Sequence, residues 1–457
     1  MSVPAPRGEV LGTWTRVRPD ARRPRAITIQ PLVVSGVVLF SLVLIRAPVF
    51  LTNTLPLAAY ASTLLPFCVA IVLLALSHPS WHARPSVLLA AGYIALIVIA
   101  AVRGSYAGVL SHNTAYLEGA QFTLLVLLGT FAFLREPRDV QRARYVRALC
   151  WAPVVFVAAN VVLHVLGIFP AGDLSADSGQ PATMLGLLGV PTDRVVFPMS
   201  GGLNGVGPTA AAALVICATF VLRRTQVKAA ILGALVSLYV ILAIDSRGAL
   251  LFGALAFALV TFAPRARKRG LGWVAILLPV LPVVLVLALT GLAETDAGSK
   301  LDRGASEGLS TGTGRTVVWG QVASVLTKPR IEHLVGYGQN GQVTSGASLG
   351  YAYLFSNEPD PLSRSAHSVV LQTVLDVGWL GLLCLIVLAK TVLSRLGRLA
   401  DDASCAALLS GTLALFLIGI VQSDPTPAHP DSFAFWVLVM FVATRAGPAL
   451  GTPRAST

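Results

Sequence analysis

Charged side chains are scarce in this sequence of 457 residues. Only 12% of the residues are Asp, Glu, Lys or Arg, whereas 55% are hydrophobic and the mean hydropathy is +0.75. A soluble domain typically carries about 25% charged residues. This scarcity excludes an ordinary soluble protein and indicates a chain that lies largely within a lipid bilayer.

Cysteine and the common cofactor motifs are also scarce. The 5 cysteines all lie within apolar stretches, and none is spaced like a disulfide pair or a zinc site. They are therefore interpreted as small buried apolar side chains. The sequence contains no HExxH motif, no Walker loop and no dinucleotide-binding fingerprint. We therefore predict neither a metal site nor a cofactor.

Long apolar runs account for most of the chain. A run of about 20 apolar residues crosses the hydrocarbon core, where an open element satisfies its backbone hydrogen bonds only as a helix. The sequence therefore predicts an all-α polytopic membrane protein with about 12 transmembrane helices. The runs span residues 31–51, 55–77, 86–102, 115–134, 148–169, 204–222, 229–244, 249–263, 273–292, 368–389, 404–422 and 432–444.

Positive charge is concentrated in the tails and in alternate short loops between these runs. The net charge of +13 therefore does not indicate nucleic-acid binding, because Lys and Arg in such loops orient a membrane protein. The strongly basic loops 135–147, 264–272 and 390–403 all fall on one side. We predict a multi-pass plasma-membrane protein with cytoplasmic N- and C-termini, which has membrane lipid but no nucleic acid as a partner.

Two long polar segments then fall outside the cell, at 170–203 and 293–366. The second is long enough to be functional, and the stretch 314–326 has an apolar face that predicts a helix within it. The predicted organisation is a disordered basic cytoplasmic tail (1–30), transmembrane helices 1–9 (31–292), an extracytoplasmic loop holding short helices (293–366), transmembrane helices 10–12 (367–444) and a cytoplasmic tail (445–457).

Three arginines on the outer side are candidate functional residues. Arg247 lies between two apolar runs at the edge of the hydrocarbon, where it either pairs with Asp245, extends to lipid headgroups or faces a site. Arg194 precedes a Gly-rich stretch that enters a helix, an arrangement whose free N–H groups can bind an anion. Arg315 begins the predicted surface helix one turn before Trp319, which is also typical of an interfacial anchor.

One histidine and one acid lie near the end of the longest outer loop. His367 stands where this loop enters a membrane helix, and its imidazole suits proton transfer near neutral pH or a hydrogen bond at the helix start. Asp376 lies nine residues further on, about half a revolution round a straight helix, so we expect it either to contact another helix or to be protonated, and interpret it as structural. His333 is interpreted as a loop residue.

Four features in order resemble the O-antigen ligase and O-antigen polymerase superfamily. The first is Arg194 before a Gly-rich helix entrance, and the second is the turn Ser246-Arg247-Gly248. The other two lie in and after the long outer loop. They are Gly314-Arg315 with Trp319, and then Gly336-Tyr337-Gly338 followed by a helix that carries His367, Leu371-Gln372, Asp376, Gly378 and Gly381. The family commonly has Asn and Glu where this chain has Ser368 and Asp376.

The resemblance implies a metal-independent, inverting glycosyltransferase with a membrane fold of the GT-C type. Its donor would be an oligosaccharide on a polyprenyl pyrophosphate such as undecaprenyl pyrophosphate, and its acceptor would be a lipid or another glycan on the outer face. In that interpretation His367 and Arg247 are catalytic, whereas Arg194 and Arg315 bind the substrate. The motifs do not distinguish a ligase from a polymerase of surface polysaccharide.

Two other functions remain open from the sequence. A flippase or transporter of lipid-linked sugars would suit about 12 helices, although transporters usually show internal repeats and polar interruptions near the midplane. No such repeat is evident here, and the charges cluster at one face. A glycan polymerase of the shape-and-division group shares the general architecture, but the Arg and His motifs fit it poorly.

Overall fold

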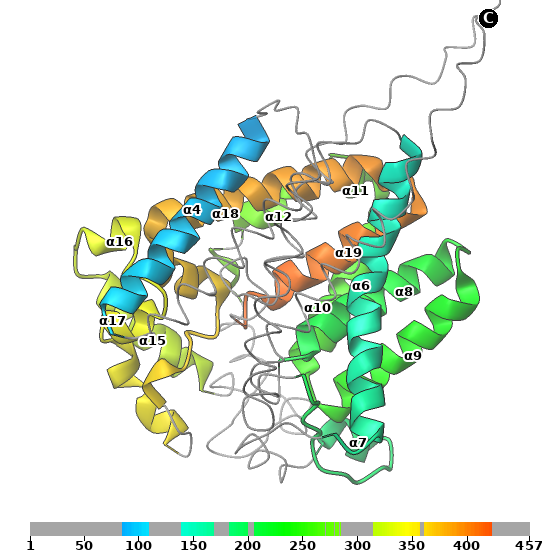
Figure 1. Ribbon diagram of the computed structural model, residues 1–457, viewed down its shortest axis with the longest axis horizontal. Helices are drawn as coiled ribbons and strands as arrows, with labels where there is room; N and C mark the ends of the chain where they lie inside the picture. The colour runs from blue at the N-terminus through cyan, green and yellow to red at the C-terminus, as the bar shows by residue number, and fades with distance from the viewer. Residues whose placement is uncertain are drawn as a thin grey trace, which may run out of the picture.

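The computed structural model describes residues 85–108, 139–168, 182–199, 205–269, 271–277, 279–282, 284, 314–356 and 361–422. Within these residues the regular elements are α-helices and short 3-10 helices (Figure 1). Their bounds are α4 Pro85–Tyr106, α6 Asp139–Val165, α7 Thr183–Leu187, α8 Gly207–Leu222, α9 Val227–Ala243, α10 Arg247–Phe262, α11 Pro264–Arg269, α12 Gly272–Leu277, α15 Arg315–Leu326, α16 Glu332–Val335, α17 Gly341–Thr344, η3 Ala347–Gly350, η4 Ala352–Phe355, η5 Pro361–Ser363, α18 Val369–Leu399 and α19 Ala403–Ile418.

The described parts of the predicted apolar runs are largely helical. Seven of the runs correspond to α4, α6, α8, α9, α10, α18 and α19, and the described part of the run 273–292 begins with α12. The runs 31–51, 55–77, 115–134 and 432–444 lie outside the described residues, as do both tails. Among the described helices, Val146–Val165 and Val369–Leu399 have the length and composition to cross a membrane, and five further apolar helices are shorter.

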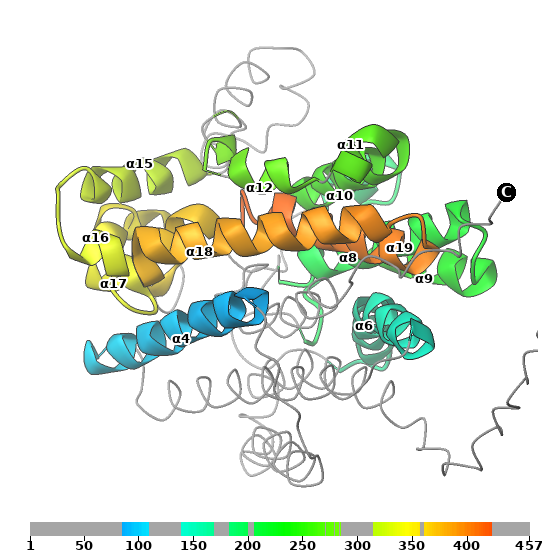
Figure 2. The same cartoon turned by 90° about the horizontal axis from the view of Figure 1, so that it is seen from above.

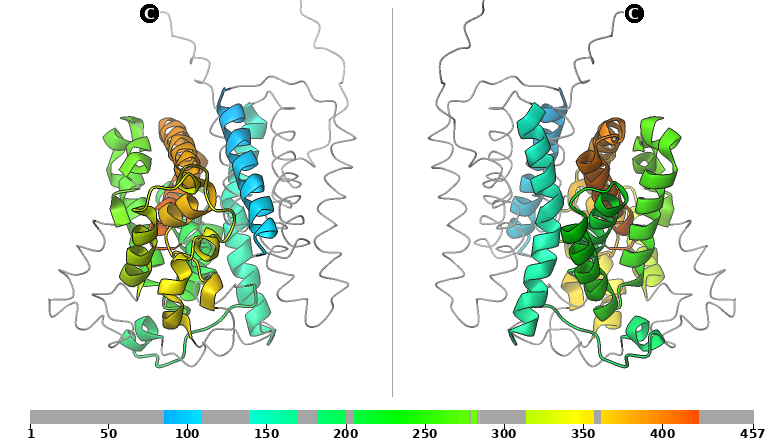
Figure 3. Two further views of the ribbon diagram at one scale, coloured as in Figure 1. Left: turned by 90° about the vertical axis from the view of Figure 1, so that its left-hand side faces the viewer. Right: turned by 90° about the vertical axis from the view of Figure 1, so that its right-hand side faces the viewer.

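The described helices form three approximate layers. Figure 2 shows α18 running through the middle, with α4 and α6 on one side and α10, α11, α12 and α15 on the other. Figure 3 shows the same order from the side, with α19 also in the middle. Helix α19 packs against α6, α8, α10 and α18, and nearly all of its residues are buried, as expected for a helix that is apolar all round.

Small residues allow the central helices to approach one another closely. Gly411 of α19 faces Ile216 of α8, and Gly253 of α10 faces Ala211 of α8. Such small residues are typical of helix contacts in membranes, where close packing replaces the hydrophobic driving force. A hydrogen bond of 3.0 Å between the buried hydroxyls of Thr219 and Ser410 also joins α8 to α19.

The basic loops meet at one end of these helices. The Arg223 guanidinium, after α8, donates to the Ala400 carbonyl at 3.3 Å, and Arg267 of α11 forms an ion pair of 2.9 Å with Asp401. The loops after α8, α10 and α18 are therefore neighbours, and their placement on the cytoplasmic side stays a prediction. The turn between α9 and α10 and the start of α18 lie at the other end of the same helices.

Helix α18 is interrupted at Gly378, where φ is 75° and ψ is −175°. Only glycine adopts this backbone conformation readily. The interruption frees helical carbonyls, and the segment after α16 binds two of them. The Tyr337 amide donates to the Leu375 carbonyl at 2.6 Å, and the Gly338 amide donates to the Asp376 carbonyl at 3.1 Å. The backbone of the Gly-Tyr-Gly element, residues 336–338, is thus hydrogen-bonded to α18 next to Gly378.

A substitution of Gly378 tests this attachment. A Cβ atom at Gly378 would collide with the backbone of Leu334 and Gly336, so Gly378→Ala is expected to lower the free energy of unfolding by at least about 2 kcal/mol. Unfolding in detergent micelles measures the change. The matched control is Gly320→Ala, which lies on an exposed face of α15 with open space around it and should be neutral or slightly stabilising. Equal effects of the two substitutions would contradict the account.

Candidate functional site

The turn between α9 and α10 holds two of the predicted residues. Asp245 adopts a left-handed backbone with φ of 54°, which Asp tolerates better than most residues. Ser246 follows at the N-cap position of α10, and Arg247 is the first residue of the helix. This tight turn leaves almost no loop between two apolar helices, so both the acid and the arginine stand at the end of the bundle.

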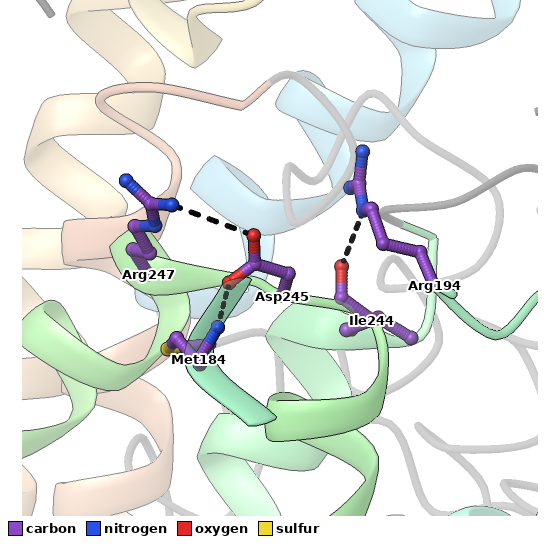
Figure 4. A network of polar contacts seen from close by, with 5 residues as sticks. All are labelled: Met184, Arg194, Ile244, Asp245 and Arg247. Atoms are coloured by element: carbon purple, nitrogen blue, oxygen red, sulfur yellow. Dashed lines mark hydrogen bonds and ion pairs between the residues drawn. The ribbon is translucent and has the colours of Figure 1, made fainter. Parts of the chain in front are cut away.

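Arg247 pairs with the acid of its own turn. Its guanidinium lies 3.6 Å from Asp245 Oδ2, and its side chain is 26% exposed whereas the Asp245 side chain is fully buried. Asp245 also accepts a hydrogen bond of 3.2 Å from the Met184 amide of α7 (Figure 4). The pairing that the sequence left open is therefore observed, and the Arg247 side chain remains partly exposed.

Arg194 stands beside the same turn. Its Nε donates to the Ile244 carbonyl at 3.0 Å, and the Val195 amide next to it donates to the Ala243 carbonyl at 2.9 Å. Arg194 is 6% exposed, so these contacts hold a buried cation in place. Figure 4 shows the guanidinium groups of Arg194 and Arg247 on either side of Asp245. Part of the Gly-rich stretch after Arg194, residues 200–204, lies outside the described residues.

His367 repeats the backbone pattern of Asp245 at the start of α18. Its φ is 48°, and Ser368 follows at the N-cap position with an extended backbone. The imidazole is partly exposed and lies against Phe355, with a ring-centroid distance of 5.7 Å. A left-handed conformation is uncommon for His, and such residues occur preferentially where the surrounding structure imposes them at functional sites.

Arg315 begins α15, as the sequence predicted, and this helix is bound to the segment that carries His367. Trp319 lies one turn along α15, and its Nε1 donates to the Ala366 carbonyl at 3.0 Å. Gly314, the N-cap of α15, lies against Leu354, the neighbour of Phe355. Arg315 is partly buried. Arg315 and His367 are therefore carried by segments in direct contact.

The end of α19 connects the two pairs of residues. The Val369 amide at the start of α18 donates to the Gly419 carbonyl at 2.7 Å. Two residues further along, Val421 lies against Gly248 at the start of α10. The four predicted residues thus come from segments that meet at one end of the described helices, opposite the basic loops. Arg194 is joined to Arg247 through one turn, and Arg315 to His367 through Ala366.

Asp376 is held by neutral donors rather than by a cation. Its Oδ1 accepts the Gly341 amide at 2.9 Å and the Gln372 side-chain amide at 2.8 Å. The acid is 7% exposed and contacts another segment, as predicted. Its partners tie α18 to α17, so within the described residues its observed role is structural.

Two hydrogen bonds of tyrosine hydroxyls, both within residues 333–364, were not found from the sequence. His333, interpreted as a loop residue, lies on α16, is 5% exposed and forms a hydrogen bond of 2.9 Å with the Tyr337 hydroxyl. The Tyr351 hydroxyl donates to the Arg364 carbonyl at 2.8 Å. Burial raises the pKa of this hydroxyl, and the nearby Asp376 raises it further. The spacing of four between His333 and Tyr337 was the available signal for the first contact.

No group of three or more His, Cys, Asp or Glu side chains suited to a metal ion occurs among the described residues. The predicted absence of a metal and a cofactor stays a prediction, because much of the chain lies outside those residues.

One part of the chain matches a known family. Residues 231–386 match the family model Wzy_C, described as O-antigen ligase. The matched segment includes Arg247, Arg315 and His367 and ends within α18, whereas Arg194 lies before it. No curated protein and no solved structure gave a significant match. Over residues 231–386 the match supports the resemblance to the O-antigen ligase and polymerase superfamily that the motifs indicated.

Proposed function

We propose that this protein transfers an oligosaccharide from a polyprenyl-pyrophosphate donor to a lipid or glycan acceptor on the outer face of the plasma membrane. The observation that carries the proposal is the meeting of the segments bearing Arg194, Arg247, Arg315 and His367 at the end of the helices opposite the basic loops. The chain would be a multi-pass protein of about 12 helices with a GT-C-like fold and cytoplasmic termini.

The arginines suit the leaving group of this reaction. When the bond between the anomeric carbon and the pyrophosphate breaks, the electron pair stays on the phosphate oxygen and negative charge grows there. Guanidinium groups remain protonated and match phosphate oxygens with two parallel donors. Fixed cations aimed at developing charge are often the largest single contribution to catalysis. Arg194 is buried and bound to the Ile244 carbonyl, so it would need little rearrangement, whereas Arg247 pairs loosely with Asp245 and is partly exposed.

His367 suits the acceptor side. The acceptor hydroxyl attacks the anomeric carbon from the face opposite the pyrophosphate, which inverts the configuration. Its proton passes to the imidazole, which also orients the hydroxyl. The histidine follows the long outer loop and is partly exposed, so an acceptor can approach it from that side. The donor's long apolar tail gives a reason for placing these groups at the end of a membrane bundle.

Arg247 is the sharpest single test. Arg247→Ala should lower the turnover number for glycan transfer by about 100-fold or more, since removal of one such electrostatic contact typically costs 10²–10³. Arg247→Lys keeps the charge but loses the planar fork, so an intermediate loss is expected. Transfer from a polyprenyl-pyrophosphate oligosaccharide in proteoliposomes measures both.

The matched control for Arg247 is Arg224→Ala. Arg224 is exposed after α8, at the end of the helices that carries the basic loops, and its loss should leave transfer unchanged. Full activity of Arg247→Ala, with membrane insertion intact, would remove Arg247 from the proposed site.

His367→Ala should abolish transfer while the protein still inserts and binds donor, because the substitution removes only the group that takes the acceptor proton. Donor binding by the purified variant, measured beside its turnover, separates the two effects. Wild-type turnover in this variant would contradict the assignment of His367 as the general base.

Independence from metal ions is a further expectation. If the arginines supply the charge that stabilises pyrophosphate, EDTA should leave the transfer rate unchanged and added Mg²⁺ or Mn²⁺ should not raise it. Loss of activity in EDTA that divalent cations restore would contradict this part of the proposal. The same proteoliposomes distinguish a flippase, which would move intact donor across the bilayer without forming a new glycosidic bond.

A further inference from the structure

The backbone of His367 is held from its N-terminal side by the residue before it. Ala366 is fully buried, its amide donates to Gln372 Oε1 at 2.9 Å, and its carbonyl accepts Trp319 Nε1 at 3.0 Å. Both polar backbone groups of Ala366 are therefore bound to side chains, one from α18 and one from α15. A left-handed His persists only where such contacts impose it, so these two bonds act directly on the direction of the imidazole.

Gln372 itself is held in a single orientation. Its Nε2 donates to Gln342 Oε1 and to Asp376 Oδ1, both at 2.8 Å, which leaves Oε1 to face the Ala366 amide. Turning the amide round would place two N–H groups against the Ala366 N–H and an oxygen against two oxygens. An amide can fill this position, whereas an ionised carboxylate has no donor for Gln342 and Asp376.

The partners of Gln372 are anchored in turn. Gln342 Nε2 donates to the Ser363 carbonyl at 2.8 Å, and Asp376 Oδ1 accepts the Gly341 amide at 2.9 Å. These hydrogen bonds therefore connect the loop segment 363–366, which precedes His367, to α17 and to the part of α18 just before Gly378. On the other side of His367, the bond from the Val369 amide to Gly419 fixes the start of α18.

We infer that Gln372 is a positioning residue, which orients His367 for reaction by holding the Ala366 amide against the Asp376 and Gln342 side chains. The inference rests on the proposed function, because it concerns the same histidine. In this inference the buried Asp376 carboxylate orients the side-chain amide of Gln372. Gln372 and Trp319 together form a clamp, in which Gln372 binds the amide of Ala366 and Trp319 binds its carbonyl.

Two substitutions that preserve shape test the clamp. Gln372→Met removes the amide at similar volume, and Trp319→Phe removes the indole N–H while keeping an aromatic ring. Each should lower kcat for glycan transfer by about 10-fold or more and change the KM for donor by less than about 3-fold, since the groups touch no donor. Because both act through Ala366, the double variant should lose less than the product of the two single losses.

Controls come from an indole hydrogen bond at the other end of the helices, which is exposed and joins two side chains. Trp151 Nε1 donates to Gln226 Oε1 at 2.6 Å, so Trp151→Phe and Gln226→Met apply the same two substitutions there. These variants should keep wild-type kcat. A common loss of kcat in all four single variants would reduce the role of Gln372 to general stability and overturn the inference.

The outcomes separate this inference from the proposed function. If the wild-type protein transfers glycan and Gln372→Met keeps its kcat, or changes only KM, the positioning role is wrong and the proposed function stands. If the wild-type protein transfers none, the proposed function fails and the inference with it. Should Gln372→Met not fold, as judged by thermal unfolding in detergent, Trp319→Phe decides alone, and an unchanged kcat for that variant overturns the inference.

Discussion

The interruption of α18 at Gly378 is the constraint on which the described structure depends. A helix in lipid must satisfy every backbone hydrogen bond, and an interruption is tolerated only where other protein groups bind the freed carbonyls. Here the amides of Tyr337 and Gly338 do so, with bonds to Leu375 and Asp376. The outer segment is thereby fastened to a core helix, and from that attachment follow the position of α17, the orientation of Gln372 and the segment that bears His367.

The turn between α9 and α10 brings charged side chains of opposite sign together. The buried Asp245 carboxylate stabilises the turn and pairs loosely with Arg247, and Arg194 Nε donates to the Ile244 carbonyl beside it. Two guanidinium groups, those of Arg194 and Arg247, therefore stand on either side of one carboxylate at this turn. Buried cations are costly in a membrane protein. In the proposed function, the pyrophosphate of the donor brings negative charge to these guanidinium groups.

The sequence predicted the described helices better than it predicted the contacts between them. The apolar runs located α4, α6, α8 to α10, α18 and α19, because burial in lipid imposes long apolar stretches, and Gly314 located the start of α15. The apolar run 368–389 gave no sign of the interruption at Gly378, since glycine is common in membrane helices. The contact of Gln372 with Gln342 was likewise hidden, because the two residues lie in segments that only the fold brings together.

A structure of the protein with a bound polyprenyl-pyrophosphate oligosaccharide, determined by electron cryomicroscopy in lipid, tests the central claim most directly. We expect the two phosphates within about 3–4 Å of the guanidinium nitrogens of Arg247 and of Arg194 or Arg315, with the anomeric carbon toward His367. Phosphates bound instead among the basic loops around Arg223 and Arg267 would contradict the account and would indicate a site at the other end of the helices.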